Sequence, residues 1–275
     1  MTPHRLAAAT ISVAALLAIA GFTALGAIFD YPRILKEPTA DMLAAFHSRE
    51  GAVVGWFVVL VIGAALLAPA AVLFGRIAGG ATGRPIATAS STPAAAFDTS
   101  GAALDTQGAA SDPPAAPVFD TPARRIMAAF DTPARRVNAA FGPPGPWITV
   151  VGVAAAVVQV VGLSRWIVLV PWINDTGVVE RLHFWLGEIV GETIGYALTA
   201  AFTVLVTHFV VRTLAPAWLT ALGHASAVLI ASGVISTPVF AAINFAGYVA
   251  WCLWLLTVAV VLWRTGAPER VSPSL

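Results

Sequence analysis

Charge is what this sequence lacks most. Asp, Glu, Lys and Arg make up only 11% of its 275 residues, while 58% of the residues are hydrophobic. Soluble domains carry about 25% charged residues, so the composition excludes an ordinary soluble domain and predicts an integral membrane protein. The formal net charge of +1 gives no electrostatic basis for a nucleic-acid partner, and the lipid bilayer is the expected partner.

Cysteine and lysine are nearly absent as well. Cys252 is the only cysteine, so no disulfide can form within the chain, and its apolar surroundings predict a small buried hydrophobe. Lys36 is the only lysine beside fourteen arginines. Together with the abundance of Ala, Val, Gly and Pro, this bias indicates a GC-rich bacterial genome, and we expect the protein in the bacterial inner membrane.

Catalytic motifs are also missing. The sequence contains no Walker loop, dinucleotide fingerprint, zinc-protease motif or serine elbow. It also has no pair of broken helices at matching positions, which would be the mark of a secondary transporter. We therefore expect a protein that is not an enzyme and that holds neither a cofactor nor a metal ion.

Long apolar runs dominate what is present, and a spanning helix needs about 20 mostly apolar residues. Pro69 is expected to kink the second run, and Pro238 to divide a stretch of 51 uncharged residues, Thr213–Trp263, into two spans. The sequence thus predicts an all-α polytopic transmembrane bundle of about six spans: Leu6–Phe29, Ala52–Gly75, Trp147–Ser164 with a continuation to Trp172, Gly187–Val211, Ala217–Ser236 and Val239–Trp263.

Arginine placement gives the bundle an orientation, because cytoplasmic loops are enriched in basic residues. One side collects ten arginines: Arg5, Arg76, Arg84, Arg124, Arg125, Arg135, Arg136, Arg212, Arg264 and Arg270. The other side has five basic residues mixed with acidic ones: Arg33, Lys36, Arg49, Arg165 and Arg181. Both termini are therefore expected in the cytoplasm.

Residues 76–146 differ in kind from the flanking transmembrane regions, 1–75 and 147–265, and from the cytoplasmic tail, 266–275. This segment is rich in Ala, Pro, Thr, Ser and Asp, and it holds a tandem 11-residue repeat that begins at Phe119 and again at Phe130. Each copy contains a proline, which breaks a helix. We expect a long disordered cytoplasmic linker between the second and third spans.

The fourth run carries the most unusual pattern. Gly187, Gly191 and Gly195 recur at every fourth residue, a spacing that lets another helix approach closely. Glu188 and Glu192 fall on an adjacent arc of the same helix, at what looks like its start. Acidic residues in a span usually face the bundle interior or a water-filled cavity.

Arg165 lies at a comparable depth on the preceding span, so a salt bridge to Glu188 or Glu192 is geometrically reasonable, and the pattern does not say which. One interpretation is an ion, proton or cationic-ligand site formed by Arg165, Glu188 and Glu192. The other is an interfacial ion pair that locks two helices. The second has the advantage that the acids lie near the interface.

Other polar residues carry weaker signals. His183 lies just outside the fourth run, and His208 and His224 sit near the cytoplasmic ends of two spans, where they could ligate a haem axially. Interfacial histidines without such a role are the commoner case. Gln159 and Asn244 are isolated within spans and are expected to form hydrogen bonds across helices.

Two short motifs, Gly-Leu-Ser-Arg-Trp at 162–166 and the Gly-Glu-rich fourth run with its Gly195-Tyr196, carry a family resemblance. The chain resembles small bacterial multi-pass membrane proteins of about six helices that are grouped only as a domain of unknown function. The resemblance covers roughly residues 1–75 and 147–265 and excludes the repeat-bearing linker. It implies a topology and no activity.

Three functions follow as hypotheses. The first is a non-enzymatic membrane protein with a structural, sensing or partner-binding role, the partner being another membrane protein or a second copy. The second is a small transporter or ion-coupled permease that uses Arg165, Glu188 and Glu192. The third is a haem-binding redox protein.

Overall fold

The computed structural model describes residues 1–82, 142–173, 175–235 and 238–266. Six of its helices are long and apolar enough to cross a membrane: Pro3–Phe29, Glu50–Gly80, Pro144–Trp172, Thr176–Leu214, Ala217–Val234 and Ala242–Thr265. The described ranges contain no strand. The prediction of an all-α bundle with six spans is therefore confirmed, whereas the linker with its 11-residue repeat lies almost entirely outside the described residues.

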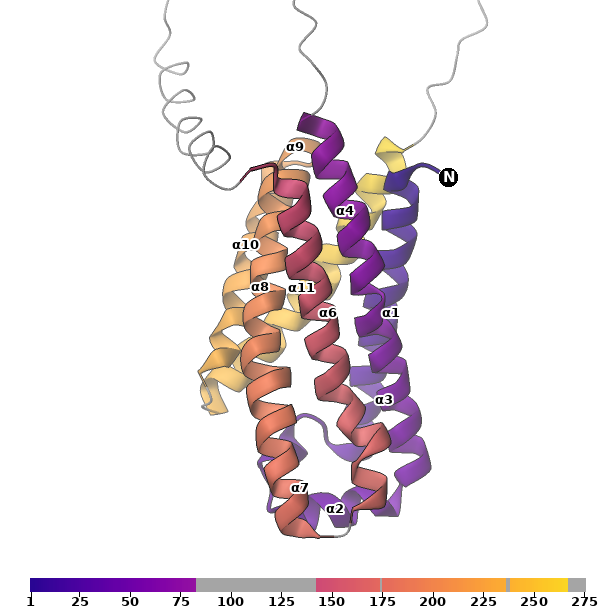
Figure 1. Ribbon diagram of the computed structural model, residues 1–275, viewed down its shortest axis with the longest axis vertical. Helices are drawn as coiled ribbons and strands as arrows, with labels where there is room; N and C mark the ends of the chain where they lie inside the picture. Colours follow the sequence, from indigo (N-terminus) through magenta and orange to yellow (C-terminus); the bar gives the residue numbers. More distant parts are fainter. Residues whose placement is uncertain (83–141, 174, 236–237, 267–275) are drawn as a thin grey trace, which may run out of the picture. The chain divides into compact units, whose positions relative to one another are not determined.

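Each span is built from one or more helical elements (Figure 1). The first three spans and the elements between them are α1 (Pro3–Phe29), η1 (Arg33–Lys36), α2 (Thr39–Ser48), α3 (Glu50–Ala65), α4 (Leu67–Thr82), α6 (Pro144–Val168) and η2 (Val170–Trp172). The remainder are α7 (Thr176–Leu182), η3 (His183–Ile194), α8 (Gly195–Val206), η4 (Thr207–Val211), α9 (Arg212–Leu214), α10 (Ala217–Ala231), η5 (Ser232–Val234) and α11 (Pro238–Thr265).

The second span is interrupted where the proline predicts it. Helix α3 ends at Ala65 and α4 begins at Leu67, so the break falls at Leu66. A proline has no N–H, and its ring clashes with the carbonyl of the fourth residue before it, which for Pro69 is Ala65. The chain re-enters a helix at once, so the two pieces still form one span.

The fourth span begins earlier than the sequence pattern predicts. Asp175 caps it by accepting hydrogen bonds from the backbone N–H groups of Gly177 and Val178, and the helix starts at Thr176 rather than at Gly187. Glu188 therefore lies well inside the helix and has no favourable position at its electropositive start. Polar residues between Asp175 and Gly187 hide this beginning from a search for apolar runs.

This span is also wound unusually. Residues His183–Ile194 form a π-helix, and so do Thr207–Val211. The Thr193 hydroxyl donates to the Glu188 carbonyl five residues earlier, at 2.9 Å, as the wider turn allows. Segments of π-helix are rare and occur frequently at functional sites, and this one holds both carboxylates of the span.

The spans form a closed ring. Each one packs on its neighbours in sequence, and α11 completes the circle by packing along α1. The start of the first span and the end of the last therefore meet, where the Thr2 hydroxyl donates to the Gly266 carbonyl at 3.5 Å. We call this the N-terminal end of the bundle; at the opposite, capped end lie η1, α2 and α7 (Figure 1).

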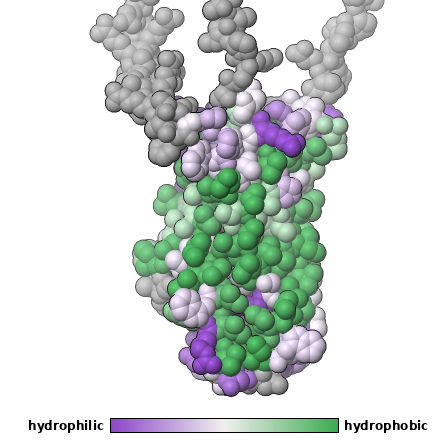
Figure 2. Space-filling view, viewed as in Figure 1, coloured by the Kyte–Doolittle hydropathy of each residue, from purple (hydrophilic) through white to green (hydrophobic). Residues whose placement is uncertain are grey.

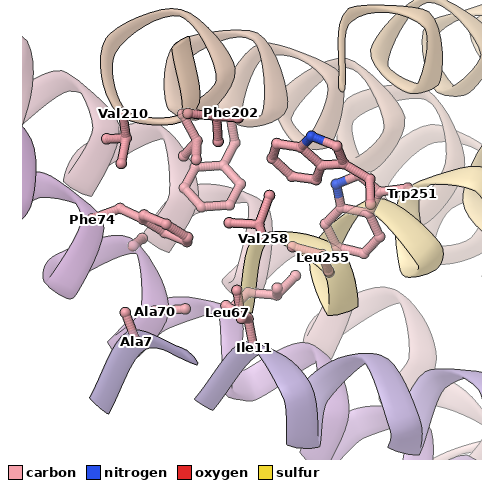
Figure 3. Packing of buried hydrophobic residues seen from close by; sticks show 14 of the residues in the cluster. Ala7, Ile11, Leu67, Ala70, Phe74, Phe202, Val210, Trp251, Leu255 and Val258 are labelled. Atoms are coloured by element: carbon pink, nitrogen blue, oxygen red, sulfur yellow. The ribbon is translucent and has the colours of Figure 1, made fainter. Parts of the chain in front are cut away.

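Two apolar cores fill the ring. The core at the N-terminal end gathers buried side chains from all six spans, among them Phe74, Phe202 and Leu255 (Figure 3). The core at the capped end is aromatic, and its centre is Trp166, whose ring stacks on Phe57 at 5.2 Å. Neither core extends along the whole length of the ring, so part of the bundle interior lies between the two cores.

The outer surface suits a bilayer. Figure 2 shows a broad hydrophobic band with hydrophilic residues gathered at both ends. Large apolar side chains such as Val150, Val228 and Leu253 are exposed there. Trp147, Trp172, Trp185, Trp218 and Trp263 are exposed near span ends, as an aromatic belt would be.

Candidate functional site

A cavity of about 460 Å³ lies between the two cores, and residues from all six spans and from η1 form its wall. It begins in the middle of the bundle, at Ala14 of α1 and Cys252 of α11. It extends to Lys36 and Arg33 in the exposed loop at the capped end. The space therefore reaches from one end of the bundle to about half its depth.

The N-terminal end of the cavity is closed by packing. Trp251 and Cys252 line the cavity and also belong to the buried core of that end. Beyond them Trp254 is fully buried, and its indole N–H donates to the Leu219 carbonyl at 3.1 Å. Packed, mostly apolar side chains therefore close this end of the cavity.

Polar side chains of the wall are held by bonds between helices. The Gln159 amide donates to the Tyr248 hydroxyl at 3.0 Å, which joins α6 to α11. Asn244 donates to the Ile230 carbonyl at 2.7 Å, which joins α11 to α10. Both predicted cross-helix hydrogen bonds are thus confirmed, and they keep the polar atoms of the wall in fixed places.

Arg165 is the most unusual residue of the wall. Its side chain is only 5% exposed, and one of its nitrogens, Nη1, donates to the Gly162 carbonyl of its own helix at 2.5 Å. Its buried Nε has no hydrogen-bond partner among the residues that the structure describes. The Trp166 ring centroid, 5.2 Å from Cζ, gives the guanidinium a cation–π contact.

No carboxylate lies against this guanidinium. Within the part of the chain that the structure describes, the ion pairs are Arg33–Asp30 and His47–Glu50, and both lie toward the capped end. The predicted salt bridge from Arg165 to Glu188 or Glu192 is therefore not formed. The physical reason is that the guanidinium packs against the backbone of the facing helix at its glycines, instead of reaching along that helix to an acid.

The three glycines of the fourth span meet α6 in register. A Cβ on Gly187 would lie 2.9 Å from Nη2 of Arg165, and a Cβ on Gly195 would lie 3.3 Å from Nε2 of Gln159. Between them Gly191 faces Gly162, where a Cβ on Gly162 would lie 2.7 Å from the Gly191 Cα. The glycine face thus admits both the close approach of the helices and the arginine side chain.

The two carboxylates of the π-helix have different positions. Glu192 lines the cavity together with Arg165, whereas Glu188 does not border it. Both are half-buried, and neither forms an ion pair within the described ranges. Of the three predicted site residues, the structure therefore brings Arg165 and Glu192 to one cavity and leaves Glu188 aside.

Residues of the first loop complete the site, and the sequence analysis missed them. Lys36, Arg33 and Tyr31 line the end of the cavity nearest the loop. Burial raises the pKa of the Tyr31 phenol to about 12, so this group stays a neutral hydrogen-bond donor at physiological pH. That Lys36 is the only lysine was visible in the sequence, but nothing there placed it at the same cavity as Arg165.

The three candidate histidines are not part of the cavity wall. Neither His183, His208 nor His224 lines the cavity, and the His208 ring packs on Phe209 at 4.8 Å. Across the described ranges, no group of three or more His, Cys, Asp or Glu side chains is placed to hold a metal ion. The cavity is therefore the part of the structure from which a function can be argued.

Comparisons with known proteins give no relative from which a function could be transferred: no family model, no curated protein and no solved structure matches the chain.

Proposed function

We propose that this chain is a multi-pass membrane protein that binds a small molecule in the cavity between its spans and acts as a sensor or partner-binding protein without catalysing a reaction. The observation that carries the proposal is a cavity of about 460 Å³ that a buried arginine without a carboxylate partner shares with Glu192. Ligand sites are typically clefts of about 300–1,000 Å³ with mostly apolar walls and a few convergent polar groups.

The location belongs to the same proposal. A bacterial inner membrane with both termini in the cytoplasm agrees with the arginine count and with the meeting of Thr2 and Gly266 at one end of the bundle. The even number of spans in the structure also agrees with two termini on one side. A partner, whether another membrane protein or a second copy, would then respond to the occupied cavity.

Native mass spectrometry of the gently extracted protein tests the proposal. We expect a small molecule to remain bound to the wild type and to be lost from Ala18→Phe, because Ala18 lines the cavity and a phenyl ring would fill part of it. Ala20→Phe is the matched control, since Ala20 is exposed on the same helix. An empty wild-type protein, or equal retention in both variants, would contradict the proposal.

Transport is the second candidate, and one observation favours it. The cavity extends from the loop at the capped end to mid-bundle and ends on a packed core, as expected of a carrier open to one side. Arg165 and Glu192 would be its substrate-facing residues, without Glu188. Uptake into proteoliposomes separates a transporter from a sensor.

The haem hypothesis has no such support, because His208 and His224 lie outside the cavity wall.

A further inference from the structure

The charges of the cavity wall are unequal. Among the residues that the structure describes, three basic ones line it, Arg33, Lys36 and Arg165, against one acid, Glu192. Arg33 already pairs with Asp30 outside the cavity. Lys36 and Arg165 have no carboxylate contact within the described ranges, and they share the space with one acid. Even with Glu192 ionised, the wall carries an excess of positive charge.

Arg165 has hydrogen-bonding capacity left over. A guanidinium has five N–H donors and always carries its charge. The side-chain bond that the structure shows uses one of them, to the Gly162 carbonyl, and the buried Nε has no partner. An isolated buried charge is costly unless something compensates it. A carboxylate or phosphate is the group that matches a guanidinium fork in charge and shape.

Much of the remaining wall is apolar, beside the hydrogen-bonded Gln159, Asn244 and Tyr248. Phe22, Leu60 and Trp251 lie along the cavity. At the junction of α10 and α11, Ile235 and Phe245 line it as well, and these residues are 51% and 45% exposed. These side chains offer an apolar surface to the body of an occupant.

We propose that the cavity binds an anionic amphiphile, with its carboxylate or phosphate held by Arg165 and Lys36 and its apolar body against the aromatic and aliphatic wall. This inference rests on the proposed function and specifies its ligand class. Glu192 restricts the site to one anionic group, because a second negative charge would meet its carboxylate.

Protection of Cys252 provides a site-specific assay, because this residue lines the cavity and is the only cysteine. The full-length protein in neutral detergent is treated with a small thiol reagent in the presence of decanoate, decanol or acetate. We expect decanoate to slow the modification at concentrations where decanol, which lacks the charge, and acetate, which lacks the chain, do not. Equal protection by decanol would overturn the anionic part of the inference, and equal protection by acetate would show a water-soluble anion as the ligand instead.

Variants test whether Arg165 and Lys36 bind the anionic group of the ligand. We expect Arg165→Gln to raise the half-protecting decanoate concentration roughly tenfold to a hundredfold, the range of a charge-assisted hydrogen bond. Arg165→Lys should retain part of the affinity. Lys36 is exposed in the first loop, so Lys36→Gln should leave the fold intact. This variant should weaken protection several-fold. Arg264→Gln is the control, because this exposed arginine lies at the other end of α11.

Stability provides the readout that separates binding from scaffolding. Without ligand, Arg165→Gln should unfold at no lower temperature than the wild type, because it removes a buried cation that lacks a carboxylate partner. A large loss of stability together with unchanged decanoate protection in Lys36→Gln would make Arg165 a structural residue and overturn the inference. If decanol protects as well as decanoate does, the proposed function stands and only the ligand class fails.

Discussion

Gly162 of α6 and Gly191 of the π-helix bring two spans into backbone contact, so that a single methyl group on Gly162 would lie 2.7 Å from the Gly191 Cα. The same approach creates the site of Arg165, whose guanidinium lies one helical turn further along the same groove, beside Gly187. Packing and site are thus coupled through one pair of helices.

Gly191→Leu should destabilise the bundle by roughly 1–3 kcal/mol, because the added side chain must push the two helices apart. Gly55→Leu is the control, since a Cβ on Gly55 would meet nothing within 4 Å. Glu188→Gln should also have a smaller effect than Gly191→Leu, because this half-buried carboxylate has no ion pair to lose. Thermal unfolding in detergent measures all three, and a harmless Gly191→Leu would contradict the close packing.

A double-mutant cycle on Arg165→Gln and Glu192→Gln should give a coupling free energy below about 1 kcal/mol. A direct buried ion pair would show a larger value, because removal of one partner typically costs about 3–5 kcal/mol. Unfolding of the wild type, the two single variants and the double variant supplies the cycle. A coupling free energy well above this value would mean that the Arg165 and Glu192 side chains form a direct ion pair.

Trp166→Ala should cost about 3–5 kcal/mol of stability, since this fully buried ring is the centre of the aromatic core at the capped end. Trp172→Ala changes the same residue type six positions later, where the side chain is 81% exposed, and should cost far less. Melting temperatures of the two variants in one detergent decide the point. Similar values for both would show that the capped core does not form.

Cys252 should react with a small, membrane-impermeant thiol reagent applied from the side of the capped end, because the cavity extends from Lys36 to this mid-bundle thiol. The reaction should be much slower from the opposite side, which the apolar core closes. Sealed vesicles of the two orientations allow the comparison, with Cys252→Ala as the blank. Equal rates from both sides would contradict a cavity closed at one end.

A phosphatase reporter inserted near residue 110 should be inactive, and a cytoplasmic reporter at the same place active. The reason is the excess of arginines in and around residues 76–146 compared with the opposite loops. Active phosphatase at this position would reverse the proposed orientation and place the capped end in the cytoplasm.

The sequence by itself determined the spans. Six apolar runs can satisfy their backbone groups in lipid only as helices, and Pro69 must interrupt the second, whatever surrounds it. Gln159 and Asn244, as isolated polar residues within spans, likewise predicted hydrogen bonds across helices. The recurrence of glycine at every fourth residue, at Gly187, Gly191 and Gly195, marked the helix face on which a neighbouring helix could pack.

Only the tertiary structure decided how the site is assembled. A search for apolar runs missed the Asp175 cap, and α-helical periodicity could not foresee a π-helix, whose wider turn changes the faces on which Glu188 and Glu192 lie. The place of Trp166 near the end of an apolar run is typical of an interfacial aromatic belt, but the core at the capped end buries this ring. Arg165 and the two glutamates lie at similar depths on neighbouring helices, which predicted an ion pair. The direction of the arginine side chain, however, depends on what lines the groove of the helix that it faces. Glycine backbone fills it here, so the arginine lies against that backbone beside an open cavity.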